Sequence, residues 1–208
     1  MVDAGGTWRT GTAAGLLARL NRSEVERRLV HVAGAAFPLA YLAGVVTWHQ
    51  LRVVYVLGLG LAAVLEFLRL VVGVEWWLFT ELTREYEREN VAGYALYTIG
   101  STVTVLVFRP EIAVPAVFLL TLVDPVSGLL ARNEFREPKR PGVLAATFTL
   151  STLVAAAFVP LPAALLAAAV TTVADGLTPV VRGHAIDDNL TIPIGAAVAM
   201  WVGLQIPF

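Results

Sequence analysis

Seven long apolar stretches alternate with short polar ones along the chain. A helix that crosses a bilayer needs about 20 apolar residues, and the breaks at 109–111 and 160–162 have the length of tight helical hairpins. The pattern predicts an all-α, polytopic integral membrane protein. We predict about seven transmembrane helices, at 29–48, 51–74, 91–108, 112–131, 143–159, 163–181 and 190–206.

Composition supports this assignment. Of the 208 residues 57% are hydrophobic and 15% charged, which is outside the usual range of soluble globular proteins. We expect a cytoplasmic N-terminal segment, 1–22, without the long apolar core of a signal peptide, followed by one transmembrane domain, 23–208. With no cysteine and three scattered histidines, the chain has no zinc-site spacing, so a bound metal would lie on carboxylates.

The basic residues predict the orientation. If the N-terminus is cytoplasmic, 13 of the 15 lysines and arginines fall on the inner side, and only Arg52 and Arg109 fall outside. The positive-inside rule therefore predicts a multi-pass protein of the cell (cytoplasmic) membrane with its polar site facing the cytoplasm. One lysine against fourteen arginines suggests a prokaryotic source.

Segment 75–90 is too polar to span. Trp76, Phe79, Leu82 and Tyr86 recur in it at helical spacing, which predicts an amphipathic helix on the inner membrane surface. Such a helix is either an anchor or a lid over a cytoplasmic site.

Several charged residues lie inside predicted spans, where each costs about 3 kcal/mol on insertion scales. Glu66 and Arg69 are three residues apart and share a helix face, as either a structural ion pair or part of a site. Asp124 lies eight residues before Arg132, and Pro125 after it removes a backbone donor. Asp124 therefore faces a polar cavity or caps a half-helix.

The last two spans carry more carboxylates. Asp175 lies toward the inner end of the sixth span, and Asp187, Asp188 and Asn189 stand at the inner mouth of the last, with Pro193 expected in its first turn. A helix cap needs only one of these three residues, so the others are available for binding.

On this topology twelve polar residues gather at the inner membrane face, and they suit one site. Carboxylates and an amide oxygen suit Mg²⁺, and cations suit phosphates, which is the set that phosphoryl transfer uses. A lipid alcohol would be the acceptor, and the chain has no GxxxxGK[ST] loop of a conventional ATP site. The residues are Arg27, Arg28, His31, Glu66, Arg69, Asp124, Lys139, Arg140, Asp175, Asp187, Asp188 and Asn189.

Five segments, in order over about residues 25–200, resemble the CTP-dependent lipid kinases, the group of dolichol kinase, phytol kinase and the CTP-dependent diacylglycerol kinase. They are RRLVH at 27–31, EFLR at 66–69, Asp124, KRPG at 139–142 and DDNLTIP at 187–193. The chain departs from the family in having Val123-Asp124-Pro125 where relatives carry Gly-Asp-Ala, and Val143 where a serine is common.

The resemblance implies a kinase that transfers the γ-phosphate of CTP to a polyprenol-type alcohol such as dolichol. It implies Mg²⁺ on Asp124, Asp187 and Asp188, and a catalytic role for Asp124 or Asp175. Asp124 is favoured as the group that orients the hydroxyl, because it is the deeper of the two. The resemblance assigns nucleotide binding to Arg27, Arg28, His31, Glu66, Arg69, Lys139, Arg140 and Asn189.

Two other classes stay open. A CTP-dependent cytidylyltransferase that makes a CDP-lipid would use similar chemistry, although its expected Lys-Asp and His-Gly-Gly signatures do not occur here. A small transporter or structural membrane protein would use the buried acids as ion pairs or a proton path. The expected partners are a lipid alcohol, a nucleotide and the bilayer, without nucleic acid, and the oligomeric state is open.

Overall fold

The computed structural model describes residues 22–83, 87–131, 138–177, 180–181, 184–185 and 187–206. Most of the expected cytoplasmic N-terminal segment, residues 1–21, lies outside these residues. The regular secondary structure of the described part is helical except for one antiparallel pair of two-residue strands, β1 (Val180–Val181) and β2 (His184–Ala185). The predicted all-α class is confirmed.

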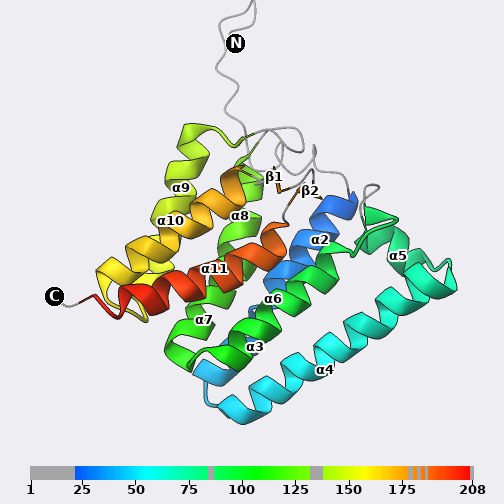
Figure 1. Ribbon diagram of the computed structural model, residues 1–208, viewed down its shortest axis with the longest axis horizontal. Helices are drawn as coiled ribbons and strands as arrows, with labels where there is room; N and C mark the ends of the chain where they lie inside the picture. The colour runs from blue at the N-terminus through cyan, green and yellow to red at the C-terminus, as the bar shows by residue number, and fades with distance from the viewer. Residues whose placement is uncertain are drawn as a thin grey trace, which may run out of the picture.

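The described helices run back and forth between two ends of a bundle (Figure 1). The start of α2, the end of α8, the start of α9 and both strands lie at the upper end in Figure 1, which we call the strand end. The turns between α3 and α4 and between α6 and α7 lie at the lower end. The helices are α2 (Arg22–Ala33), α3 (Ala36–Leu42), α4 (Trp48–Phe67), α5 (Trp77–Leu82), α6 (Gly93–Val107), α7 (Pro110–Phe118), α8 (Asp124–Leu130), α9 (Pro141–Ala156), α10 (Leu161–Leu177) and α11 (Asp188–Gly203).

Two π-helical turns lengthen this set. Turn η1 (Leu68–Val72) extends α4, and turn η3 (Leu119–Val123) joins α7 to α8. The resulting helices, Trp48–Val72 and Pro110–Leu130, are both long and apolar enough to cross a membrane. Four further apolar stretches, among them α6, α9 and α10, have 10–17 residues. Seven crossings therefore stay a prediction.

The helix Pro110–Leu130 forms the centre of the bundle, where residues 112–121 are all buried. Around it, α11 packs against α10, α6 and α7, and α9 packs against α10. Small residues bring these helices close: a β-carbon on Gly203 would lie 2.5 Å from the Cα of Ala163. Close approach through small residues is typical of helices that associate in lipid.

The first turns of α11 are tied to α6. The N-cap of α11 is Asp187, so Pro193 lies in the second turn, and our expectation that it falls in the first turn is wrong. A proline there leaves the carbonyl of Asn189, four residues earlier, without its helical donor. A β-carbon on Gly100 of α6 would lie 2.8 Å from that carbonyl oxygen. Gly100 thus lets α6 approach the start of α11.

Segment 75–90 contains less helix than predicted. Gly73 has a φ of 75°, a left-handed conformation that ends a helix and favours glycine. Helix α5 then covers only Trp77–Leu82, because both Trp76 and Thr83 have extended backbone. Residues 84–86, with Tyr86, lie outside the described part. A continuous surface helix through 75–90 is therefore wrong.

Candidate functional site

Three aspartates from three helices meet at one point. Asp124 is the first residue of α8, Asp188 the first of α11, and Asp175 lies near the end of α10. One carboxylate oxygen from each lies within 4.8 Å of the others. Carboxylates this close repel each other unless a cation or a proton neutralises them. The arrangement fits a divalent cation that prefers oxygen ligands.

Asp124 reaches this point through a break in the helix. Its backbone amide donates to the carbonyl of Leu119, five residues earlier, in the π-helical turn η3. Pro125 follows and cannot donate a backbone hydrogen bond. The predicted disturbance of the helix around Asp124 and Pro125 is therefore present as a π turn, which is frequent at functional sites.

Asp175 is held by a buried hydrogen-bond network. Its Oδ1 accepts from Lys139 Nζ at 2.5 Å and its Oδ2 from Ser127 Oγ at 2.6 Å. The hydroxyl of Thr147 donates to Ser127 Oγ at 2.8 Å. The side chain of Asp175 is 0% exposed. Both oxygens are therefore fixed, which suits a positioning role better than contact with an incoming alcohol.

Asp124 is the more accessible carboxylate. His31 Nδ1 lies 3.6 Å from its Oδ2, with side-chain exposures of 19% for His31 and 17% for Asp124. The ring of Tyr97 packs against His31 at 5.1 Å between centroids. His31 thus belongs to the surroundings of Asp124. A partly accessible carboxylate beside an imidazole can orient a hydroxyl group.

The predicted phosphate-binding cations have different positions. Arg28 of α2 donates from Nη1 to the carbonyl of Pro125 at 3.0 Å, which brings its guanidinium to the turn after Asp124. Arg140 is exposed at the N-cap of α9. The side chain of Arg27 lies outside the described part. Arg28 and Lys139 are thus the predicted cations that contact groups of the site.

The start of α11 adds polar groups. Asp187 Oδ1 accepts from the amide of Asn189 at 2.9 Å, so Asp187 caps the helix. Asn189 is 6% exposed, and its Oδ1 has no hydrogen-bond partner among the described residues. A buried carbonyl oxygen without a donor, next to Asp188, fits a cation ligand. Metal binding by Asp187 therefore stays a prediction. Asp175, which was not predicted as a metal ligand, lies in the carboxylate cluster with Asp124 and Asp188.

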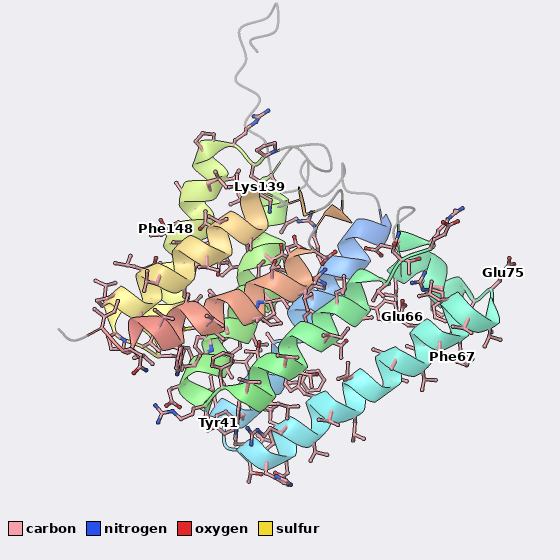
Figure 2. The ribbon with its side chains drawn as sticks, in the orientation of Figure 1. Tyr41, Glu66, Phe67, Glu75, Lys139 and Phe148 are labelled. Carbon is pink, nitrogen blue, oxygen red and sulfur yellow. The ribbon has the colours of Figure 1, made fainter. Side chains whose placement is uncertain are left out.

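Glu66 and Arg69 form the predicted ion pair. Arg69 donates from Nε to Glu66 Oε1 at 3.0 Å and from Nη2 to Glu66 Oε2 at 2.7 Å. Figure 2 shows Glu66 on the side of α4 toward the bundle and its neighbour Phe67 pointing outward. Glu66 also accepts from the amide of Ala92 at 3.2 Å and from the hydroxyl of Tyr94.

The same arginine holds the segment before α6. Its Nη1 donates to the carbonyls of Glu87 at 2.9 Å and Arg88 at 3.2 Å, and its Nη2 donates to that of Asn90 at 2.6 Å. With the two bonds to Glu66, all five N–H donors of a guanidinium are in use. This geometry gives Arg69 a structural task, and its predicted nucleotide contact stays a prediction.

Sequence reasoning missed Thr147 and Glu87. Glu87 is 4% exposed, and a β-carbon on Gly93 would lie 3.4 Å from Glu87 Oε1 and 3.1 Å from Asn189 Nδ2. The segment held by Arg69 therefore reaches the start of α11. A threonine within an apolar helix and a glutamate among other surface charges carry no signal in the sequence that separates them from ordinary residues.

Comparison of the chain with protein-family models, with curated proteins and with solved structures finds no match. The functional assignment rests on the chain's own residues and geometry, and the resemblance to CTP-dependent lipid kinases stays a prediction.

Proposed function

We propose that this chain is a Mg²⁺-dependent membrane kinase that transfers the γ-phosphate of CTP to a polyprenol-type lipid alcohol at the cytoplasmic face. One observation carries the proposal: Asp124, Asp175 and Asp188 come from three helices and bring carboxylate oxygens within 4.8 Å of one another. Lys139 and Arg28 bring cationic side chains to the same region. Metal-binding acids beside phosphate-binding cations are what phosphoryl transfer requires.

The metal would be held by Asp124 and Asp188, with the orphaned amide oxygen of Asn189 as a further ligand. When bound, Mg²⁺ spreads the negative charge that develops on the phosphates during transfer. Asp175 keeps its hydrogen bond to Ser127, and its Oδ1, which accepts from Lys139 without the metal, can face the metal once Lys139 turns toward a phosphate.

The nucleotide phosphates would lie against Arg28 and Lys139, with Arg27 and Arg140 as the other predicted contacts. The positive end of the α11 helix dipole lies at the same place, and it favours an anion. Both features support a nucleotide that enters from the strand end, where Lys139 lies before α9 (Figure 2).

The acceptor hydroxyl would meet Asp124. Its carboxylate orients the hydroxyl and accepts its proton while the new O–P bond forms and the bond to the β-phosphate breaks, leaving CDP. We assign this task to Asp124 because its side chain is 17% exposed, whereas that of Asp175 is fully buried. His31, with Nδ1 3.6 Å from Asp124 Oδ2, lies beside this carboxylate.

A multi-pass topology belongs to the same proposal. Seven apolar helical segments cross the membrane, with the strand end in the cytoplasm. Two described helices have the required length and apolar composition, and Arg28, Lys139 and Arg140 belong to the strand end, in agreement with the positive-inside rule.

The test is transfer of label by the purified protein in detergent with Mg²⁺ and CTP or ATP labelled at the γ-phosphate, against a panel of lipid alcohols and phosphatidate. Label on an alcohol with CTP, lost in Asp124→Asn, supports the kinase. Pyrophosphate release with phosphatidate would identify a cytidylyltransferase, and no turnover with any pair would favour a transporter or structural protein.

A further inference from the structure

Gly128 of α8 lies directly under the head group of Arg28. A β-carbon built on Gly128 would lie 2.6 Å from Arg28 Nη1 and 3.0 Å from both Cζ and Nη2. Contacts under 3.0 Å are too close for a real β-carbon, so any larger residue at 128 forces the guanidinium to move. The same Nη1 donates to the carbonyl of Pro125 at 3.0 Å, so the head group is fixed across one turn of α8.

The glycine lies on the face of α8 that carries Asp124. Residues four apart are neighbours on one face of an α-helix, separated by about 6 Å along its axis. The guanidinium over Gly128 is therefore held about one turn from the Asp124 carboxylate. A phosphate whose metal lies on Asp124 would meet the guanidinium at this distance.

We propose that Gly128 is a positioning residue for nucleotide binding. Because Gly128 has no side chain, it leaves the space in which the Arg28 guanidinium lies, and we call this space the seat. The role of Arg28 toward nucleotide phosphate rests on the proposed function, whereas the seat rests on the contacts of Gly128. Glycine inside a helix costs roughly 0.5–1 kcal/mol relative to alanine. Gly128 therefore needs a reason other than helix stability.

Two other glycines show what distinguishes this seat from helix packing. At Gly100 and Gly203 the nearest atom to an added β-carbon is backbone of a neighbouring helix. At Gly128 the three nearest atoms all belong to the end of the Arg28 side chain, which can turn away. Gly128→Ala should therefore displace a side chain and leave the helices in place.

The experiment compares Gly128→Ala, Arg28→Ala and the double variant in lipid nanodiscs. Gly60→Ala is the matched control, because Gly60 is also helical and an added β-carbon there meets nothing within 4 Å. Dissociation constants for Mg²⁺-CTP should rise roughly 10- to 100-fold in Gly128→Ala and in Arg28→Ala, the usual range for a lost charged hydrogen bond. The double variant should bind no more weakly than Arg28→Ala, and Gly60→Ala should bind normally.

Hydrogen exchange of the α2 amides is a second readout that needs no nucleotide. Because Arg28 ties α2 to Pro125, exchange in α2 should rise equally in Gly128→Ala and Arg28→Ala and stay unchanged in Gly60→Ala. Unchanged exchange in Gly128→Ala would overturn the seat, as would additive effects in the double variant. If exchange behaves as expected but the native protein binds no CTP, the seat stands and the proposed kinase function fails.

Discussion

Lys139 Nζ donates a hydrogen bond of 2.5 Å to Oδ1 of Asp175, a carboxylate whose side chain is 0% exposed. The same carboxylate lies within 4.8 Å of ligand atoms of Asp124 and Asp188. The ammonium group of Lys139 therefore neutralises part of the cluster that we propose for Mg²⁺. A lysine in this position competes with a metal ion for Asp175 and, once the metal is bound, can turn toward a phosphate.

Replacing Lys139 should have opposite effects on two ligands. Lys139→Gln removes the competing charge, so binding of Mn²⁺ alone, measured by electron paramagnetic resonance, should become roughly tenfold tighter. Binding of Mg²⁺-CTP should weaken by a similar factor, because a phosphate contact is lost. A lysine with a purely structural role would weaken both.

Arg140→Gln is the matched control for the metal measurement, because it removes a neighbouring positive charge that is exposed at the N-cap of α9. It should leave Mn²⁺ binding unchanged. Equal tightening in Arg140→Gln and Lys139→Gln would mean that only the overall charge matters, against a direct competition at Asp175.

Asp124→Asn should lower turnover, whereas Asp175→Asn should lower the stability of the protein. Without the carboxylate of Asp124, turnover should fall about 10²- to 10⁴-fold, which is the usual cost of a lost acid–base group. The unfolding temperature should change little. Asp175→Asn should destabilise the protein by roughly 3 kcal/mol, because it leaves the half-buried ammonium of Lys139 without its carboxylate.

The double variant Asp175→Asn with Lys139→Gln should recover much of that stability, since it removes both charges together. Unfolding temperatures in detergent compare the stabilities of Asp124→Asn, Asp175→Asn and the double variant. Full turnover in Asp124→Asn with normal CTP binding would assign the hydroxyl to another residue.

Arg69→Lys should loosen the segment before α6. A lysine has three donors and cannot replace the five bonds that Arg69 makes to Glu66 and to the carbonyls of Glu87, Arg88 and Asn90. We expect faster hydrogen exchange in 87–92 and a lower unfolding temperature. The Mg²⁺-CTP dissociation constant should rise less than in Arg28→Ala. A larger rise, with unchanged exchange, would support direct nucleotide binding by Arg69.

Single cysteines can test the orientation, because the native chain has none. Val45, in the turn before α4, and Glu89, before α6, are both exposed and lie on opposite sides of the predicted second span. In intact cells a membrane-impermeant maleimide should label Val45→Cys at once, and Glu89→Cys only after permeabilisation. The reverse pattern would invert the topology, and immediate labelling of both would contradict a crossing by α4.

The sequence could predict the helical class and the aspartates, because apolar length and the cost of a buried charge are local properties. Asp124 and Asp175 stood out for that reason, and Asp188 stood out because a helix cap needs only one of the three polar residues at the start of the last span. The three aspartates meet in the structure. The choice between Asp175 and Asp187 was not predictable: which carboxylate caps α11 and which joins the cluster depends on how α10 meets α11.

Other parts of the site depend on packing alone. Thr147 and Gly128 are ordinary small residues of apolar helices until Ser127 and Arg28 from other elements are brought against them. The predicted surface helix was too long. The helical spacing of its apolar residues carries no information about the extended backbone at Trp76 and Thr83, or about the backbone carbonyls that Arg69 binds. Such constraints come from contacts distant in the sequence.

The most direct test of the kinase is to follow both ends of the nucleotide in one reaction. Purified protein with Mg²⁺ and a polyprenol is given CTP labelled either at the α- or at the γ-phosphate. We expect γ-label on the lipid and one CDP released for each phosphate transferred, with no α-label on the lipid. Label from the α-phosphate on the lipid, with pyrophosphate released, or no label from either position across the alcohol panel, would contradict it.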